Sequence, residues 1–369
     1  MLRDVTRVLV AHSLALLSLF VACEEIEVIE KSTCDSMRAC RAELPTVMRA
    51  IRVSQFGSPD VLQLRENVVV PKPSVNEVLL KVYAAGVNPV ETYIRRGNYA
   101  MLPNLPYTPG NDAAGVVTAV GSKVKNFKVG DRVFTRSCSG SYAEYTTALE
   151  DQVYKLHERL TFSHGASIGV PYRTAHVAIH SRAKARPAET VLVHGASGGV
   201  GVASVQLAVA HGMTVLGTAG SDEGMASVQK VGAHHVFNHS SEDYTEKIME
   251  VTGGKGVNVI LEMLANVNLA KDLKLLAVGG RVVVIGSRGD ISITPRDLMA
   301  RNSVVIGLGR MGEEEANDAY SAIQSGIALG WITPVVGKVY PLEKAREAQI
   351  DVIEGKAKGK MVLTMTESS

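Results

Sequence analysis

Cysteine is scarce in this sequence. The 369 residues contain four, of which Cys23, Cys34 and Cys40 lie before residue 48 and Cys138 stands alone. No CxxC pair and no His/Cys cluster occurs, although such pairs are typical of zinc sites and disulfide frameworks. The sequence therefore predicts neither a zinc-binding lobe nor a disulfide-bonded scaffold.

A strong charge of either sign is also missing. Lys and Arg number 39 and Asp and Glu 37, which gives a net charge of +2. Dedicated nucleic-acid surfaces usually show as strong basicity, so the composition does not favour one. We interpret the local basic group Arg182, Lys184 and Arg186 as a solvated loop. With 46% apolar residues, the chain is ordinary globular material, long enough for two domains.

No hydrophobic run predicts a stable membrane span. The apolar stretch 8–22 follows Arg3 and Arg7 as in a secretory signal peptide, but a bilayer needs about 20 apolar residues. Phe20 stands where a cleavage site would prefer a small residue. A targeting segment and a disordered extension or mis-assigned start both stay open for residues 1–47. We predict a cytoplasmic location, with a cleaved or targeting N-terminus as the alternative.

A strand, a turn without side chains and a helix follow one another after Thr190. Val191–Val193 is a short aliphatic run, typical of a strand buried on both faces of a parallel sheet. The turn places Gly195, Gly198 and Gly201 at a spacing that is a variant of the dinucleotide fingerprint. Because unpaired N–H groups and the positive end of a helix dipole meet at such a turn, the stretch predicts a pyrophosphate site.

Strands and helices alternate beyond the fingerprint. Five further strand patterns occur: TVLGTAG, HHVFNH, VNVILEM, RVVVIGS and SVVIGLG. Together with the first, they fit a doubly wound parallel sheet of order 3-2-1-4-5-6. The following EEEANDAYSAIQSGIALG predicts a helix and KMVLTM a strand. Since the alternation has stopped there, we expect the tail to return to the first domain.

The chain before the fingerprint is rich in short strands and turns, which predicts a small β-rich barrel or sandwich. Within it, Asn88-Pro89-Val90-Glu91 has an N-cap residue, a proline and an acid in the order that opens a helix. We expect this helix to stop at Gly97, with Asn88 as its cap. A second helix is predicted over 163–181.

An acid is missing at the end of the second strand of the predicted parallel sheet. In NAD-binding proteins an acid about 20 residues past the fingerprint holds the adenosine 2′-hydroxyl. Ala219 stands there, so a 2′-phosphate would meet no repulsion, and NADPH is favoured over NADH. His239 and Arg288, both just after strands, are candidate partners for the extra phosphate. An exposed loop position is the alternative for each.

Long continuous stretches between about Met48 and Met365 resemble the zinc-free quinone oxidoreductases of the medium-chain dehydrogenase/reductase superfamily. Among them are GVNPVETYIRRG, LPYTPGNDAAGVV, VLVHGASGGVG, EMLANVNL and GGRVVVIGSRG. The resemblance implies an α/β protein with NADPH and a quinone in the cleft between two domains. Its parts would be the extension 1–47, a GroES-like β-rich catalytic domain over 48–165, a Rossmann domain over 166–310 and a returning segment over 311–369.

The resemblance also implies site residues. Asn88 and Tyr93 would orient the acceptor or the nicotinamide ribose as the catalytic pair. The implied cofactor contacts are Tyr93, Ser197, Gly198, Gly199, Val200, Gly220, His239, Asn268, Ile285, Gly286, Ser287 and Arg288. After the sixth strand, 308–312 departs from the Val-Thr-Leu type run of the relatives, so no contact is carried over there.

Zinc-dependent members of the superfamily have a Cys before the first helix and a GHE motif after it. This sequence has Gly86-Val87-Asn88 and Gly110-Asn111-Asp112 there, so we predict no catalytic metal. Without a metal to polarise the acceptor, the enzyme should favour one that is already electrophilic, such as a quinone or a conjugated enone. No matched motif offers a convincing proton donor, so we expect protons to come from solvent.

The predicted function is therefore NADPH-dependent, zinc-independent quinone reduction. The resemblance implies one-electron reduction of ortho-quinones to semiquinones, which the residues do not separate from two-electron hydride transfer. An NADPH-dependent enone or alkenal reductase is the alternative. The resemblance further implies a homotetramer and binding of AU-rich RNA. A structural role in the lens is an alternative function that is not enzymatic.

Overall fold

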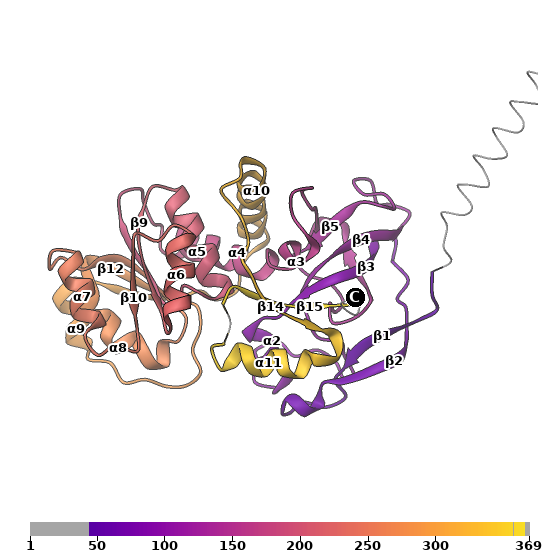
Figure 1. Cartoon of the computed structure of the whole chain (residues 1–369), viewed down its shortest axis with the longest axis horizontal. Helices are drawn as coiled ribbons and strands as arrows, with labels where there is room; N and C mark the ends of the chain where they lie inside the picture. The colour runs from indigo at the N-terminus through magenta and orange to yellow at the C-terminus, as the bar shows by residue number, and fades with distance from the viewer. Residues whose placement is uncertain (1–43, 357, 366–369) are drawn as a thin grey trace, which may run out of the picture. The chain divides into compact units, whose positions relative to one another are not determined.

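The computed structural model describes residues 44–356 and 358–365 (Figure 1). The signal-like stretch and the other predictions for residues 1–43 therefore lie outside the described residues. Within the described part, no helix combines the length and the apolar character that crossing a bilayer would require.

The larger of the chain's two main sheets collects strands from both ends of the described chain. Its order is β14-β15-β3-β4-β5-β7, with β6 paired to β3, and β1 and β2 form a separate antiparallel pair. The strands are β1 (Val47–Arg52), β2 (Gln63–Val69), β3 (Glu77–Gly86), β4 (Asp112–Val120), β5 (Arg132–Thr135), β6 (Tyr145–Leu149), β7 (Val153–Lys155), β14 (Val336–Pro341) and β15 (Lys360–Thr364). This is the predicted β-rich part of the protein.

The first helix of this part is α2 (Pro89–Arg95), one residue shorter than the sequence predicts. Pro89 opens it, and the Glu91 carboxylate accepts the backbone N–H of Asn88 at 3.1 Å. Asn88 is the N-cap residue as predicted, but its side chain bonds to other groups. Because Glu91 reaches back to the cap, the Asn88 amide is available for the site described below.

The second sheet is parallel, and its strand order is the predicted 3-2-1-4-5-6. Its strands run β10-β9-β8-β11-β12-β13 across the sheet. They are β8 (Thr190–Val193), β9 (Thr214–Ala219), β10 (His235–Asn238), β11 (Val257–Glu262), β12 (Leu276–Val284) and β13 (Val304–Gly307). From β8 the chain adds β9 and β10 on one side of the sheet, and it then crosses to add β11, β12 and β13 on the other side. The strand order thus reverses between β8 and β11. Ligands of such sheets bind at the carboxyl ends of the strands beside this switch point.

Helices connect the parallel strands in sequence (Figure 1). They are α5 (Gly199–Ala210), α6 (Asp222–Lys230), α7 (Tyr244–Val251), α8 (Ala265–Leu275) and α9 (Pro295–Arg301). Short 3-10 turns occur elsewhere at η1 (Pro59–Val61), η2 (Glu150–Gln152) and η4 (Leu342–Lys344).

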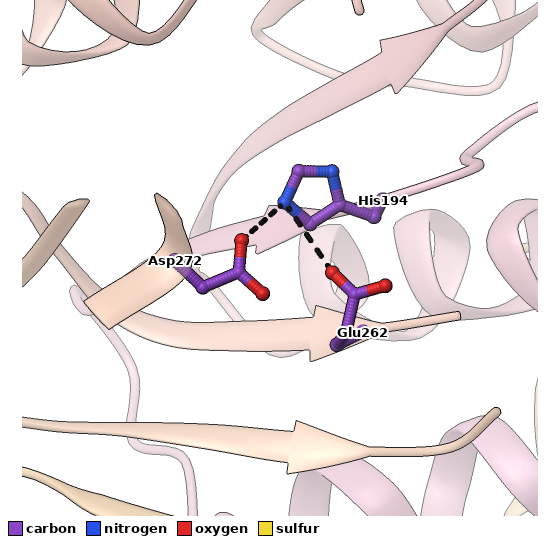
Figure 2. Close-up of side chains that lie close together, drawn as sticks. All are labelled: His194, Glu262 and Asp272. Carbon is purple, nitrogen blue, oxygen red and sulfur yellow. Dashed lines mark hydrogen bonds and ion pairs between the residues drawn. The ribbon is translucent and has the colours of Figure 1, made fainter. Parts of the chain in front are cut away.

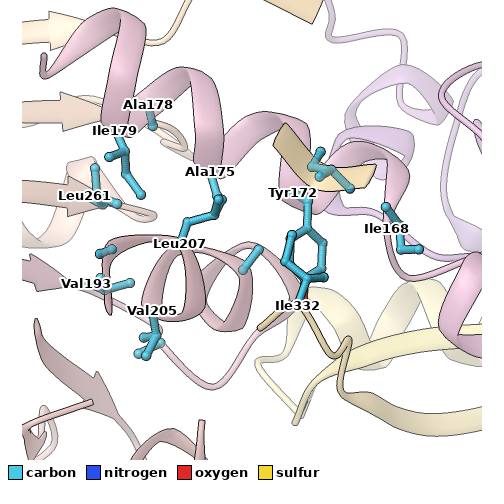
Figure 3. Packing of buried hydrophobic residues seen from close by; sticks show 14 of the residues in the cluster. Ile168, Tyr172, Ala175, Ala178, Ile179, Val193, Val205, Leu207, Leu261 and Ile332 are labelled. Atoms are coloured by element: carbon cyan, nitrogen blue, oxygen red, sulfur yellow. The ribbon is translucent and has the colours of Figure 1, made fainter. Parts of the chain in front are cut away.

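The segment 163–181 is mostly helical, as predicted, but the helix is interrupted. The segment divides into α3 (Phe162–Gly165), α4 (Gly169–His176) and a π-helical turn, η3 (Val177–Arg182). The Tyr172 side chain of α4 lies beside α5 in the main hydrophobic core (Figure 3), where its hydroxyl donates to Gln206 at 2.7 Å. Tertiary packing of this kind overrides the local helical pattern.

The C-terminal part contains α10 (Glu313–Leu329), which contacts α4, and then β14, α11 (Ala345–Ile353) and β15. β15 pairs antiparallel with β3, with Val362 opposite Gly86. The last strand of the described residues thus lies in the same sheet as β3 and β4. β14 and α11 were not predicted from the sequence.

Candidate functional site

The glycine turn after β8 has the geometry that its spacing predicts. Gly195 adopts a φ of +55°, a backbone conformation that side chains disfavour. A Cβ on Gly201 would lie 2.3 Å from the carbonyl oxygen of Gly195, so only glycine lets helix α5 pack this closely on the turn. Glycine is therefore required at both positions by the backbone conformation and the packing of the turn.

The two glycines between them have a different role. Gly198 is the N-cap of α5, and no side chain caps the helix. A Cβ on Gly198 would come no nearer than 3.5 Å to another group, and one on Gly199 no nearer than 3.4 Å. The first N–H groups of a helix have no intrahelical acceptor. The start of α5 thus presents free N–H groups and the positive helix end in an uncrowded place, which suits a phosphate.

The end of the chain crosses this turn. The Gly359 N–H donates to the Ser197 carbonyl at 2.6 Å, and Gly359 forms an isolated parallel bridge with Gly198. The next residue, Lys360, runs its aliphatic stem past Gly199. Sequence reasoning missed Gly359 and Lys360, because residues so far along the chain give no local signal of their proximity.

A buried polar network surrounds the Lys360 ammonium. Its Nζ lies 2.9 Å from Asp112 Oδ2 and also bonds to Asn88 Oδ1, and Lys360 is only 4% exposed. The Asn88 amide nitrogen donates to Asp112 Oδ2 at 2.9 Å and to Glu91 Oε1 at 3.1 Å. Tyr142 donates its hydroxyl to Glu91 Oε2 at 2.6 Å. Five polar side chains from four segments are thus joined away from water.

Asn88 and Asp112 belong to the two segments where the family resemblance implies ligands in zinc-dependent members. The structure brings their side chains together around an ammonium group. A cation already bound between an amide oxygen and a carboxylate leaves no ligand set for a divalent metal, so this donor set does not fit zinc. Burial raises the pKa of Glu91, against the opposing effects of Lys360 and Tyr142.

Tyr93 lies half-buried on α2, close in sequence to this network. Among the described residues, its hydroxyl has no hydrogen-bond partner, whereas both polar atoms of the Asn88 side chain are bonded. The two residues predicted as a catalytic pair therefore differ: one has a free hydroxyl and the other is fixed in place.

The predicted partners of a 2′-phosphate lie at different strands. His239 follows β10, with its ring next to Gly220 at the end of the neighbouring strand β9. Arg288 follows β12, where its guanidinium donates to the Ile353 carbonyl at 2.8 Å. β9 and β12 are three strand spacings apart, about 14 Å. His239 alone lies near the strand end where Ala219 stands.

Ala219 itself ends β9 with its side chain buried, and its carbonyl accepts the His239 N–H at 3.1 Å. The following Ser221 caps helix α6, so its hydroxyl accepts from Gly224. Burial lowers the pKa of His239, and the charge of His194 lowers it further. This end of the sheet therefore carries a histidine whose burial favours its neutral form, and no carboxylate at the β9 terminus.

The other predicted cofactor residues gather around Glu262 at the end of β11. Asn268 donates its amide to Glu262 Oε1 at 3.1 Å. The N–H groups of Ile285 and Gly286 donate to the Glu262 carbonyl at 2.8 and 3.2 Å. Ser287 turns its hydroxyl to the carbonyl of Gly289. The carboxyl edge near the switch point thus collects these residues from three segments, whereas Val200 and Ser197 belong to the turn at β8.

The interpretation of Arg182 as a solvated loop residue is wrong. Its side chain is 20% exposed, pairs with Glu315, and donates to the carbonyls of Leu308 at 2.8 Å and Arg310 at 3.1 Å. Arg182 therefore fixes the segment 308–312, where the sequence departs from the family pattern. Glu315 has its pKa lowered to about 2 by its bond to Arg182.

Comparison with known proteins agrees with this architecture. Residues 74–158 match the alcohol dehydrogenase GroES-like domain and residues 199–325 the zinc-binding dehydrogenase domain. A human quinone oxidoreductase is 54% identical over 323 residues, which cover 86% of this chain and 98% of the relative.

Two solved structures are also similar. A mycobacterial protein complexed with NADPH has a TM-score of 0.77 at 32% identity, and covers 86% of this chain and 99% of its own. The CurK enoyl reductase has a TM-score of 0.78 at 26% identity, and covers 87% of this chain and 100% of its own.

A GroES-like sheet domain combined with a parallel-sheet dinucleotide domain defines a nicotinamide-dependent oxidoreductase. More narrowly, the chain belongs to the zinc-free quinone oxidoreductases of the medium-chain dehydrogenase/reductase superfamily.

Proposed function

We propose that this chain is an NADPH-dependent, zinc-independent quinone reductase. The observation that carries the proposal is the uncapped start of α5 at Gly198, beside a β9 terminus without a carboxylate. The name of the human relative and the NADPH complex of the mycobacterial structure support the same assignment.

The residues present fit a dinucleotide. Its pyrophosphate would lie at the start of α5 beside the Val200 N–H, where the missing Cβ atoms of Gly198 and Gly199 allow the phosphate to approach the main chain. The bound nicotinamide would supply the reducing equivalents, and the protein would position the acceptor and exclude water.

Tyr93 and Asn88 would each help to orient the acceptor or the nicotinamide ribose. The Tyr93 hydroxyl is free among the described residues to bond the acceptor or the nicotinamide ribose. The Asn88 carbonyl oxygen binds Lys360 and keeps a second lone pair for a ligand, while the Asn88 amide is held by Asp112 and Glu91. Asn88 would thus present one acceptor in a fixed direction.

We assign the contact with the 2′-phosphate to His239. It lies beside Gly220 at the end of β9, the strand that binds the adenosine ribose in folds of this class. Arg288, Ser287 and Asn268 lie at the other half of the sheet and would contact the second nucleotide.

A further proposal concerns the number of electrons transferred per step. Within the family the sequence resembles zeta-crystallin, and this resemblance favours one-electron reduction of ortho-quinones to semiquinones. Electron paramagnetic resonance during NADPH turnover tests it. A semiquinone signal is expected, and stoichiometric hydroquinone without any signal would favour two-electron transfer.

The main experiment titrates purified protein with NADPH and NADH while cofactor fluorescence is followed, and then measures turnover. We expect tighter binding of NADPH, turnover of 9,10-phenanthrenequinone, and no loss of activity after treatment with a chelator. Absence of binding to either cofactor, or inactivation by the chelator, contradicts the proposal.

Enone or alkenal reduction is the second candidate, because the similar CurK structure is an enoyl reductase. A conjugated enone is an electrophile of the same kind as a quinone and would need no metal. Parallel assays with the quinone and with an alkenal separate the two functions. A larger kcat/KM for the alkenal would favour the second.

Assembly, location and RNA binding stay predictions. The edge strand β13 exposes Val304 and Val305, which supports self-association and so the predicted homotetramer. Sedimentation tests the tetramer, and mass spectrometry of the natural N-terminus tests the cytoplasmic location. A gel shift with an AU-rich oligonucleotide, competed by NADPH, tests RNA binding.

A further inference from the structure

Three ionisable side chains meet in the interior of the parallel-sheet domain, beneath the proposed cofactor site. His194 follows β8, Glu262 ends β11 and Asp272 lies in α8. The His194 Nε2 is 3.0 Å from Asp272 Oδ1 and 3.7 Å from Glu262 Oε2 (Figure 2). His194 is 3% exposed and the two acids 0%, so water does not solvate this triad.

The charges of the triad do not balance without an additional cation. In the part of the chain that the structure describes, no lysine or arginine forms an ion pair with Glu262 or Asp272. Glu262 Oε2 and Asp272 Oδ2 are buried without a hydrogen-bond partner. Two ionised carboxylates beside one imidazolium would leave a net negative charge in a medium of low dielectric constant.

One proton on a carboxyl group neutralises this net negative charge. A carboxylic acid gains an O–H donor that an ionised carboxylate lacks, and the unpartnered oxygens provide an acceptor for it. Burial raises the pKa of Glu262 to about 7; the positive charge of His194 opposes this shift, and the charge of Asp272 adds to it. The spacing of the three groups would also suit a metal ion, but a proton is sufficient to satisfy both oxygens.

The imidazole connects the triad to the glycine turn. His194 Nδ1 lies 3.2 Å from the Thr218 hydroxyl, which also accepts the N–H of Gly195 at 3.3 Å. The Thr218 carbonyl accepts the N–H of Ala196 at 2.8 Å. A change in the charge or position of His194 therefore acts directly on the start of the phosphate-binding turn.

Glu262 connects the triad to the other side of the proposed site. Its carboxylate accepts from the backbone N–H of Leu264 and from the Asn268 amide, and its carbonyl accepts from Ile285 and Gly286. Three of these four are positions that the family resemblance implies as cofactor contacts. The triad is thus the common support of segments that follow β8, β11 and β12.

We propose that His194, Glu262 and Asp272 are positioning residues that share a buried proton and support the cofactor-binding segments, so that dinucleotide binding is linked to uptake of that proton. This inference rests on the proposed nicotinamide site. A dinucleotide is a polyanion, and loss of the proton would place one more negative charge beneath it. Affinity for the cofactor therefore falls as pH rises through neutrality.

Other ionisable groups face the triad and have to be separated from it. His239 follows β10 and interacts with the charge of His194. Tyr244 of α7 interacts with Asp272 and Glu262, and the Lys271 ammonium of α8 lies 5.6 Å from the Tyr244 ring. Burial raises the pKa of Tyr244 and lowers that of His239, so both shifts move the titration of these groups away from that of Glu262.

The test measures proton uptake directly. Calorimetric titration of the full chain with NADPH and with NADH at pH 7, in buffers of different ionisation enthalpy, gives the number of protons taken up. We expect a fractional uptake with both cofactors, and an affinity about fivefold weaker at pH 8.5 than at pH 6. NADH serves as the second probe because it lacks the 2′-phosphate, which titrates itself.

Glu262→Gln is the decisive variant, because the amide has the shape of a protonated carboxyl group and cannot release the proton. It should still bind both cofactors, with no proton uptake and a flat pH dependence. Glu246→Gln on the exposed face of α7 is the matched control and should behave as the native protein. If Glu262→Gln does not fold, Asp272→Asn replaces it with the same expectation.

Two results overturn the inference. One is native proton uptake in the folded Glu262→Gln or Asp272→Asn protein, and the other is a stoichiometric metal ion in the native protein by elemental analysis. Failure of the native protein to bind either cofactor at any pH contradicts the proposed function instead, so the two failures are distinguishable.

Discussion

The Lys360 ammonium lies 2.9 Å from the Asp112 carboxylate, and both side chains are buried. The pair joins β15, the last strand of the chain, to the start of β4, and it lies against the helix that begins the proposed cofactor site. A buried ion pair need not add stability, but removal of one partner leaves an uncompensated charge. The pair therefore ties the end of the chain to both the fold and the site.

Removal of this ammonium should destabilise the protein strongly. Lys360→Met keeps the aliphatic stem but leaves the buried Asp112 side chain without its cationic partner, so we expect a loss of about 3 kcal/mol in the free energy of unfolding. Lys344→Met is the control, since Lys344 pairs with Glu347 at the surface and should contribute less than about 1 kcal/mol. Urea unfolding measures both. Equal stability of the two variants would disprove the importance assigned to the buried pair.

The glycines of the fingerprint turn should separate into two classes. Gly201→Ala places a Cβ 2.3 Å from a backbone oxygen and should prevent normal folding, whereas Gly198→Ala has room and should leave the unfolding midpoint unchanged. Gly198→Ala should instead weaken dinucleotide binding about tenfold or more, because its methyl group occupies the space proposed for the phosphate. Thermal unfolding and cofactor titration measure the two effects. Unchanged NADPH affinity in Gly198→Ala would falsify the proposed phosphate position.

Asn88 and Tyr93 should respond differently to substitution. Tyr93→Phe removes a hydroxyl that has no partner among the described residues, so stability should stay the same while kcat/KM for the quinone falls about fivefold. Asn88→Ala breaks bonds to Lys360, Asp112 and Glu91, and should lower the free energy of unfolding by about 2 kcal/mol as well as the activity. Steady-state kinetics and urea unfolding test both. Full activity of Tyr93→Phe would exclude its orienting role.

The assignment of the 2′-phosphate contact predicts a change in cofactor preference. His239→Gln should weaken binding of NADPH more than that of NADH, by about fivefold, since His239 lies at the β9 terminus. Arg288→Gln is the comparison and should affect both cofactors alike, because Arg288 follows β12. The ratio of the dissociation constants for NADPH and NADH in each variant tests the assignment. If Arg288→Gln instead weakens NADPH binding selectively, the 2′-phosphate contact belongs to Arg288.

A cluster of three histidines should make the fold sensitive to acid. His180 lies between His176 and His211, with ring centroids 4.6 and 4.5 Å apart, and burial followed by the charges of these neighbours lowers its pKa to about 4. Since the unfolded chain binds this proton near pH 6.5, stability is complete above pH 6.5 and falls between pH 6.5 and 4. After allowance for partial solvent exposure, we expect a loss of about 1 to 2 kcal/mol.

Urea unfolding at several pH values, followed through the fluorescence of Trp331, measures this loss. His180→Gln removes the titrating group and should flatten the dependence. A native slope in that variant would show that other groups cause the acid sensitivity.

The sequence by itself determined the parallel-sheet domain. Aliphatic runs such as Val191–Val193 at regular intervals predict strands buried on both faces, and right-handed crossovers leave few possible orders. The spacing of Gly195, Gly198 and Gly201 likewise predicted the geometry of the turn that we propose binds phosphate, because that geometry is local to one strand, one turn and one helix.

Only the tertiary structure decided what surrounds that turn. Lys360 and Gly359 reach it from the far end of the chain, and His194, Glu262 and Asp272 come together from two strands and a helix. Such contacts depend on how the sheets and helices pack, and no local periodicity reports them. The same reason explains why Arg182 looked like a loop residue: its contacts with residues far along the chain are not contained in a linear pattern.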